Sequence, residues 1–238
     1  MTLDGTNTWL LSAPGSDSVV VVDPGPKNPG HLSTILDRAA ERGRVALIVL
    51  THGHADHSAS ARSFAESIGV NVRAVDPEHR LGAEGLAGGC VIDLGDWTID
   101  VVATPGHSAD SVSLLVRHDG SVLTGDTVLG RGSSIVAWPD GRLGAYLDSL
   151  HRLRDLVDGR SITRLLPGHG PVVDDPARAL DEYLEHRMAR LAQVRELLGA
   201  GVREPQAIVE CVYADVPREA WPWAELTVRA QLDYLAEQ

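Results

Sequence analysis

Short apolar runs and longer amphipathic segments alternate along the chain up to about residue 170. The apolar runs are rich in valine, isoleucine and leucine, and glycine, proline, aspartate or serine bounds them, which is typical of β-strands. We expect strands within residues 6–13, 17–25, 45–52, 70–75, 90–95, 98–107, 110–117, 120–126 and 161–170.

The amphipathic segments predict helices within residues 31–43, 58–69 and 144–159. In the last of these, apolar residues recur at spacings of three and four and therefore share one side of a helix. Several strands follow one another too closely for a crossover helix to lie between them. The pattern predicts an α/β fold with layered, partly antiparallel sheets.

The character of the chain changes after Pro176. Residues 177–201 predict one long helix, and residues 204–214 and 223–238 predict two shorter helices on either side of a loop. We therefore expect a first domain over residues 1–175 and a C-terminal helical region over residues 176–238.

Five predicted strands end in side chains that can bind metal ions. These ends are THGHADH at 51–57, TPGHSADS at 104–111, TGDT at 124–127, PGHGP at 167–171 and, more weakly, VVDPG at 21–25. Strand ends in a layered α/β fold converge on one edge, where loops carry functional groups on a rigid support. We expect these five loops to lie together.

The first of these loops carries the strongest signal for a metal site. His52 and His54 alternate in an extended turn and can face one ion, while Asp56 and His57 face a neighbouring position. Imidazole nitrogens and carboxylate oxygens are ligands of zinc, iron and manganese.

His107, His169 and Asp126 are each ambiguous alone, because a polar residue can simply close a turn or cap a helix. The two histidines each follow a Pro-Gly pair at a strand end, and Asp126 also ends a strand. Next to the first cluster, a ligand role is the better interpretation for all three. A carboxylate has two oxygens, so Asp126 can bridge two cations.

The composition of the chain limits its possible partners and its location. The chain has 238 residues with a net charge of −12, which works against a general polyanion-binding surface. No apolar run approaches the length of roughly 20 residues that a membrane span needs. No secretory signal is visible at the N-terminus. We expect Cys90 and Cys211 to be buried thiols rather than a disulfide, which fits a cytoplasmic protein.

These residues resemble the metallo-β-lactamase-fold hydrolases over roughly residues 5 to 175. The matched pattern is THGHADH followed in order by His107, Asp126 and His169. The resemblance implies a four-layer αββα sandwich with a two-metal site, most often zinc, along one edge. It implies that one metal is held by His52, His54 and His107, that the other is held by Asp56, His57 and His169, and that Asp126 bridges them.

Further stretches, TLDGTNTWLL, VVDPGP, TGDTVLGRG and YLEHRMAR, resemble the lactamase-beta-2-like branch. That branch carries a small winged-helix-like C-terminal region and includes an endoribonuclease acting on single-stranded RNA. Relatives usually have a strand before the TLDGTNT stretch and a β-hairpin wing at the end, and they often have histidine at the position of Gln231. We expect a truncated, winged-helix-like region here.

The predicted function is a two-zinc hydrolase that uses a metal-bridging hydroxide on a small ester, thioester or lactone. Iron or manganese are alternative metals. Asp56 is the expected proton acceptor, and Asp23 is a candidate to orient an imidazole. The alternatives are a phosphodiesterase or single-strand endoribonuclease and, more distantly, a nucleic-acid-binding regulatory protein. The partner is then a small molecule or single-stranded RNA, and the oligomeric state stays open.

The five remaining histidines carry weaker signals. We expect His31, His79, His118 and His151 at the surface. His186 lies in a basic helix with three arginines, and this helix is either a solvated face or a contact for a substrate anion: Arg187, Arg190 and Arg195. We expect this helix to begin beside the metal edge, and the C-terminal region to shape the substrate pocket.

Overall fold

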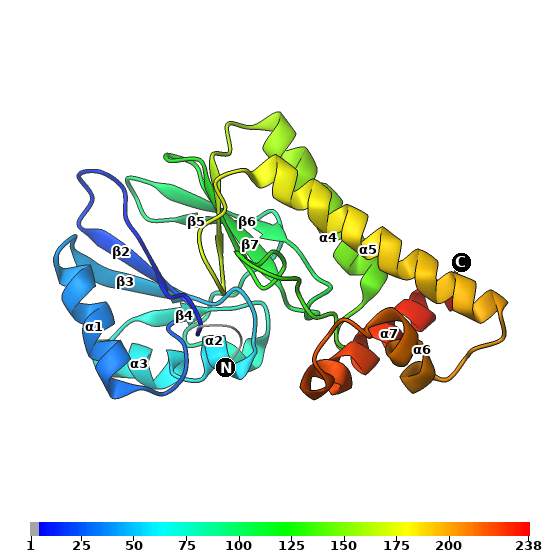
Figure 1. The fold of residues 1–238 in the computed structure, drawn as a ribbon. Helices are drawn as coiled ribbons and strands as arrows, with labels where there is room; N and C mark the ends of the chain where they lie inside the picture. Colours follow the sequence, from blue (N-terminus) through cyan, green and yellow to red (C-terminus); the bar gives the residue numbers. More distant parts are fainter. Residues whose placement is uncertain (1–4) are drawn as a thin grey trace.

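The computed structural model describes residues 5–238 of the protein, so the beginning of the TLDGTNT stretch lies outside the described residues. Two sheets, both drawn in Figure 1, organise the chain. The first has the strand order β1-β2-β3-β4, and the second has the order β5-β6-β7-β8-β9. Among residues 5–238, none of the helices combines the length and the apolar character needed to cross a membrane.

The first sheet is mostly parallel. Its strands are β1 (Trp9–Leu11), β2 (Ser18–Val22), β3 (Arg44–Val49) and β4 (Asn71–Arg73). β1 pairs antiparallel with β2, whereas β2, β3 and β4 pair in parallel. β2 contains four successive buried valines, which fits a strand covered on both faces.

The second sheet is mostly antiparallel. Its strands are β5 (Val91–Asp93), β6 (Thr98–Ala103), β7 (Val112–Val116), β8 (Ser121–Gly125) and β9 (Arg164–Pro167). β5 to β8 pair antiparallel in chain order, and β9 joins β8 in parallel. The expectation of partly antiparallel sheets is confirmed.

Helices cover the outer face of each sheet, as Figure 1 shows. The first sheet packs against α1 (Pro29–Ala40) and α3 (Ala61–Ile68), with Ile35 and Phe64 in a shared apolar cluster. The second packs against α4 (Leu143–Gly159) and α5 (Pro176–Gly199). The largest cluster, which includes Val20, Val49 and Leu114, lies between the two sheets. The predicted four-layer αββα sandwich is confirmed.

Helix ends follow local rules. Asn28 caps α1 by accepting from the backbone N–H of His31, and Asp175 caps α5 by accepting from that of Arg178. Gly69 ends α3 in the left-handed conformation, as the sequence predicted. The four-residue helix α2 (Ala55–Ser58) and two short 3-10 helices, Pro77–His79 and Arg218–Ala220, were not predicted.

The C-terminal region contains α6 (Pro205–Val212) and α7 (Trp221–Ala236), which pack on the second half of α5. Ile208, Val228 and Val194 of the three helices share one apolar cluster. All of residues 205–238 are described, and they form helices without a strand. The division of the chain at residue 175 stays a prediction.

Two expectations are wrong. After His169 the chain turns back along β9, and Val173 pairs with Leu165, so α5 begins away from the edge that carries the histidines. Cys211 is exposed and Cys90 is half-buried, although both are free thiols as expected. An exposed position on a short amphipathic helix explains Cys211, because the neighbouring Val209 and Val212 take the buried side.

Candidate metal centre

The strands that carry the predicted ligands all point to one edge of the molecule. β2 and β3 run in parallel, and β6, β8 and β9 share one direction because β7 is antiparallel to both of its neighbours. The two sheets meet at this edge, where the backbone N–H of Val112 donates to the carbonyl of Thr51 at 2.9 Å. The loops after β2, β3, β6, β8 and β9 therefore lie together, as predicted.

His52, His54 and His107 form the first half of the cluster. His54 Nδ1 lies 3.0 Å from His52 Nε2 and 3.0 Å from His107 Nε2. His52 and His107 are buried, whereas His54 is exposed at the mouth of the site. The backbone of His54 is extended, with φ −57° and ψ 140°. His54 directly precedes α2, which carries two residues of the second half of the cluster.

Asp56, His57 and His169 form the second half. The short helix α2 places Asp56 and His57 on its first turn. His169 Nε2 lies 3.3 Å from His57 Nε2 and 3.3 Å from Asp56 Oδ2. At 3.3 Å, the lone pairs of the two Nε2 atoms of His57 and His169 would repel each other unless a proton or a cation lies between them.

Asp126 lies between the two halves. Its Oδ2 is 3.7 Å from His107 Nε2 and 3.2 Å from His169 Nε2, and its Oδ1 is 3.4 Å from His57 Nε2. The carboxylate thus reaches a member of each half. All seven residues singled out by the sequence come together here; that they bind metal ions stays a prediction.

Two features of the chain fit a cation at this position. Asp126 Oδ1 is buried and makes no hydrogen bond to any residue from 5 to 238. An unsatisfied buried carboxylate oxygen is costly, and a cation would satisfy it. Gly168 is the second feature, because a Cβ there would lie 2.5 Å from Asp126 Oδ1 and 2.7 Å from His57 Cε1. The cluster is compatible with a binuclear metal site.

In two of the histidines, the ring nitrogen that points away from the cluster contacts a hydrogen-bond acceptor, and this contact fixes where the ring carries its proton. His107 Nδ1 lies 2.7 Å from the carbonyl of Ile135, and His169 Nδ1 lies 2.9 Å from the carbonyl of Gly5. A carbonyl can only accept, so Nδ1 carries a proton in both rings and Nε2 is the ring nitrogen that faces the cluster. His54 differs, because it presents Nδ1.

Asp23 orients one histidine in each half. Its Oδ2 lies 2.8 Å from His57 Nδ1 and accepts from Thr51 Oγ1 at 2.6 Å. Thr51 Oγ1 in turn lies 3.1 Å from His52 Nδ1 and accepts its proton. The expected contact between Asp23 and an imidazole is confirmed. Asp23 also has a φ of 51°, a left-handed conformation that aspartate tolerates better than most residues.

The two halves differ in their proton affinity. Burial lowers the pKa of His52 and of His107, and neighbouring imidazoles reinforce the effect. Burial acts the same way on His57, but Asp23 and Asp126 outweigh it and raise the pKa of His57 to about 10.

The carboxylates in turn are held in the charged form. Burial lowers the pKa of His169, but Asp126 and Asp56 outweigh it and raise the value to about 9. The hydrogen bond from His169 holds the pKa of Asp56 at about 2. Burial of Asp126 favours its neutral form, but His169 and His57 outweigh this and hold its pKa well below the usual range.

A cavity of about 710 Å³ opens onto the cluster. Four of its lining residues are predicted ligands: His54, Asp56, His107 and Asp126. Its lining also includes apolar side chains, those of Leu129, Ile135, Ala137 and Trp223. Trp223 belongs to α7 and is 55% exposed, so the C-terminal region shapes the pocket, as expected.

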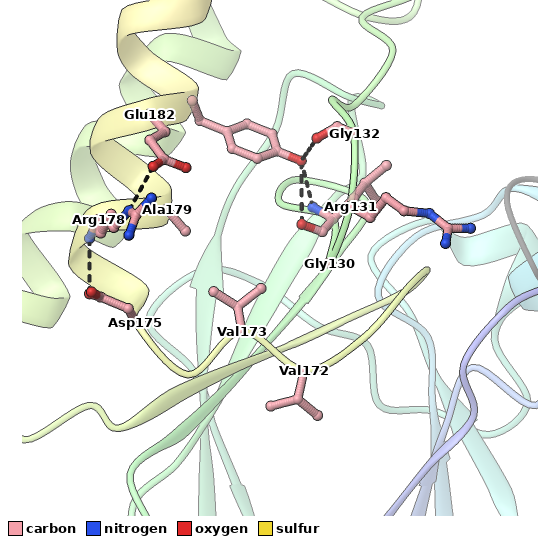
Figure 2. Close-up of a pocket in the computed structure, with 11 residues that line it drawn as sticks. Gly130, Arg131, Gly132, Val172, Val173, Asp175, Arg178, Ala179 and Glu182 are labelled. Carbon is pink, nitrogen blue, oxygen red and sulfur yellow. Dashed lines mark hydrogen bonds and ion pairs between the residues drawn. The ribbon is translucent and has the colours of Figure 1, made fainter.

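Residues 129–132 separate this cavity from a smaller one of about 360 Å³, shown in Figure 2. The polar groups of the smaller cavity are already paired, since Arg178 Nε donates to Glu182 at 2.7 Å. Tyr183 Oη accepts from the N–H of Leu129 at 2.8 Å and fixes the separating loop. Arg131 lines both cavities, and its guanidinium group points away from α5 in Figure 2.

The remaining histidines lie outside the cluster. His118 and His151 are exposed as expected, while His31 and His79 are half-buried. His31 Nε2 lies 2.9 Å from Thr8 Oγ1. None of the four joins the histidine–aspartate groups found among the described residues.

Two arginines of the basic helix belong neither to a solvated face nor to a contact for a substrate anion. Arg187 is buried, and it donates to the carbonyl of Ser134. Arg190 donates to the carbonyl of Val212 and pairs with Asp215 at 3.0 Å. Both guanidinium groups are used in internal contacts, because the side of α5 that carries them packs against other elements.

Sequence reasoning missed several residues around the site. The loop with Ser134 and Ile135, which holds His107, has no distinctive pattern. Trp223 lies far from every strand-end motif. Thr51 stands inside the motif THGHADH, and its position before the first histidine is the one signal that could have marked it.

Comparisons with known proteins agree with this architecture. Residues 1–169 match the model of the metallo-beta-lactamase superfamily, and residues 205–238 match that of the beta-lactamase associated winged helix domain. The chain is 31% identical over 229 residues to the beta-lactamase-like protein 2 homolog of Caenorhabditis elegans, covering 91% of this chain and 73% of that protein.

Solved structures show the same fold. A beta-lactamase domain protein from Burkholderia ambifaria superposes with a TM-score of 0.82 at 25% identity, covering 100% of this chain and 84% of that one. TTHA1623, solved in a di-iron-bound form, gives a TM-score of 0.59 at 27% identity and covers 76% of this chain and 92% of that one. With its layered sheets and its clustered histidines and aspartates, the chain belongs to the metallo-beta-lactamase superfamily, whose members are generally metal-dependent hydrolases.

Proposed function

We propose that this protein is a two-metal hydrolase that cleaves an ester, thioester or lactone bond in a small molecule. Zinc is the proposed metal, because three imidazoles in one half and a mixed imidazole–carboxylate set in the other suit it. Iron is the first alternative, supported by the di-iron form of a structural relative, and manganese is the second.

The make-up of the large cavity carries this proposal. At about 710 Å³ it lies within the range of small-molecule sites, roughly 300–1,000 Å³. It is lined both by members of the histidine–aspartate cluster and by apolar side chains, among them Ile135 and Trp223. Within the described residues, Arg131 is the one basic side chain that lines it. This lining suits an apolar acyl portion better than a polyanionic chain.

The proposed chemistry assigns roles to residues of the site. A pair of divalent cations, when bound, supplies Lewis acidity and lowers the pKa of a water molecule. Asp56 is partly exposed to the cavity and is ionised at neutral pH, so it can accept the proton of the attacking water. Thr6 Oγ1 donates to Asp56 Oδ2 at 3.4 Å and helps to hold that oxygen in place.

A second candidate is a phosphodiesterase or single-strand endoribonuclease. Arg131 and Trp223 line the same cavity, and a cation beside an aromatic ring can bind a phosphate and a stacked base. The match to a winged helix domain points the same way. Against it stands the use of Arg187 and Arg190 inside the protein, which withdraws two basic groups from any nucleic-acid surface.

A regulatory, non-catalytic nucleic-acid-binding protein is the weakest candidate. Such a protein has no need of a complete set of seven ligand-type side chains at one edge. Here all seven are present and assembled: His52, His54, Asp56, His57, His107, Asp126 and His169.

The test combines metal analysis with a substrate panel. Zinc-loaded protein should contain two ions per chain and should hydrolyse members of an ester, thioester and lactone panel more efficiently than RNA oligomers. No more than one tightly bound ion after loading would overturn the two-metal assignment. Cleavage of RNA without hydrolysis of any small substrate would favour the second candidate.

A matched pair of variants tests the cavity wall. Trp223→Ala should raise KM for substrates with a bulky apolar acyl group by about tenfold, equal to about 1.4 kcal/mol, and leave the metal content unchanged. Met188 is also exposed and lies in the C-terminal half of the protein, but it does not line the cavity. Met188→Ala should leave KM unchanged; an equal effect of both variants would contradict the proposed wall.

A further inference from the structure

Arg187 lies in the middle of α5 and is only 4% exposed. A guanidinium group this deeply buried is costly unless its N–H groups and its charge have partners. Arg187 Nη2 donates to the carbonyl of Ser134, and its guanidinium carbon lies 4.9 Å from the centre of the Tyr146 ring, whereas its Nε has no hydrogen-bond partner among the described residues. Both partners lead directly to the metal-ligand loops.

The first partner leads to His107. Ser134 Oγ lies 3.2 Å from His107 Nδ1, and the carbonyl of the next residue, Ile135, accepts the proton of that nitrogen at 2.7 Å. Arg187 therefore holds the short segment that orients the His107 imidazole. The segment has no regular secondary structure, so its position depends on such side-chain contacts.

The second partner leads to the loops of His107 and Asp126. Burial raises the pKa of Tyr146, so its hydroxyl stays protonated and donates to the carbonyl of Thr127 at 2.6 Å, one residue after Asp126. Gly106 packs so closely on Tyr146 that a Cβ would lie 2.3 Å from the Tyr146 backbone. Tyr146, whose ring lies under Arg187, thus contacts a residue adjacent to each ligand: Thr127 through its hydroxyl and Gly106 through its backbone.

We propose that Arg187 is a positioning residue for the metal centre, which fixes the Nε2 direction of His107 through the Ser134–Ile135 segment. The residue touches none of the seven proposed ligands in any contact described above, so it acts through the segment and through Tyr146. The inference rests on the proposed two-metal function. It also gives α5 a role in the site that its sequence position, 18 residues after His169, does not suggest.

The same helix provides a matched control. Arg190 lies one turn further along α5, and its guanidinium carbon is 5.0 Å from the centre of the Tyr213 ring. It donates to a backbone carbonyl, that of Val212, just as Arg187 donates to that of Ser134. Both arginines donate to a carbonyl and lie over a tyrosine ring, but Arg190 also pairs with Asp215 and joins α5 to the C-terminal helices rather than to the ligand loops.

The experiment is a titration of Co²⁺ into the metal-free full-length protein. Calorimetry measures the binding, and the visible spectrum reports the surroundings of the bound ion. Arg187→Lys keeps a buried cation but loses the planar fork that spans the carbonyl and the ring. We expect one of the two ions to bind about tenfold more weakly, the lower end of what loss of an outer-shell contact costs. The spectrum of that ion should change, while the other ion binds as in the parent protein.

Arg190→Lys should leave both binding steps and the spectrum unchanged. The inference is overturned if Arg187→Lys gives the parent isotherm and spectrum, or if both variants weaken binding equally, because the effect would then be general loosening of α5. It is also overturned if Arg187→Lys weakens both ions to the same extent. A parent protein that fails to bind two ions would instead contradict the proposed function, so the two failures are distinguishable.

Discussion

The two halves of the histidine–aspartate cluster are neighbours, yet they hold protons very differently. His52 and His107, in the first half, are surrounded mainly by other imidazoles, and burial lowers the pKa of both. In the second half, the carboxylates of Asp23, Asp56 and Asp126 overcome the same burial and raise the pKa of His57 and His169. Without a metal, burial therefore favours the neutral form of His52 and His107, whereas the carboxylates favour the protonated form of His57 and His169.

One edge of the molecule therefore presents two unlike sites. A cation in the first half should displace no proton from His52 or His107, whereas a cation in the second half must displace protons from His57 and His169. Asp126 joins the halves because its two oxygens reach His107, His57 and His169.

Replacing Asp126 should weaken metal binding in both halves of the cluster. Asp126→Ala removes the carboxylate that contacts both halves, so both ions should lose affinity and hydrolysis should cease. The loss of affinity should exceed the roughly 10–100-fold typical of an outer-shell partner. Elemental analysis after dialysis measures it, and His151→Ala, an exposed position, serves as control. Two retained ions in folded Asp126→Ala would refute the bridging role.

Replacing one ligand in each half should separate the halves. Asp56→Asn should abolish hydrolysis and release the ion of the second half, while the first half keeps its ion. His54→Ala should show the converse metal loss, because His54 lies within reach of His52 and His107 only. Each folded variant should therefore retain one ion per chain. Loss of both ions in both variants would mean that the halves are not independent.

Replacing Asp23 should weaken the second half more than the first. Asp23 contacts His57 directly but reaches His52 only through Thr51. Asp23→Asn preserves the size of the side chain and tolerates the left-handed φ of 51°, so the change isolates the carboxylate. We expect a loss of metal affinity of roughly 10–100-fold in the second half. Calorimetric titration measures this loss, and equal losses in both halves would contradict the direct contact.

The pH dependence of metal binding should differ between the halves. The metal-free protein has a pKa of about 10 at His57 and about 9 at His169, so both imidazoles are protonated at neutral pH. A cation must displace these protons, and its affinity should fall as the pH falls, by about tenfold per pH unit for each proton released. Burial holds the pKa of His52 and of His107 below the usual imidazole value, so a cation should displace no protons from these two ligands between pH 8 and pH 7, and binding in the first half should depend less on pH than binding in the second. Titrations in buffers of different ionisation enthalpy count the protons released, and a count of zero for both ions would contradict the contrast.

Much of the fold could be predicted from the pattern of neighbouring residues in the sequence. The valine run of β2 and the stop at Gly69 are decided by neighbours in sequence, and both lie where they were expected. The cap at Asn28 is equally local, but it was not predicted. The seven proposed ligands were recognisable because each follows an apolar strand, and the strands deliver their ends to one edge. The turn back after His169 was not recognisable, because the pairing of Val173 with Leu165 depends on a neighbouring strand rather than on a local signal.

Alternation, capping and turn chemistry act over a few residues, so the layered α/β class, the strand ends and the residue types that gather there can be read from the sequence. The tertiary structure was needed to place the groups that hold the ligands: the carbonyl of Ile135 at His107, that of Gly5 at His169, and Asp23 at His57. It likewise decided that Arg187 is buried and that Trp223 faces the cavity. These contacts join residues 28 to 164 positions apart or depend on how whole helices pack, and such packing is a property of the assembled layers rather than of any one segment.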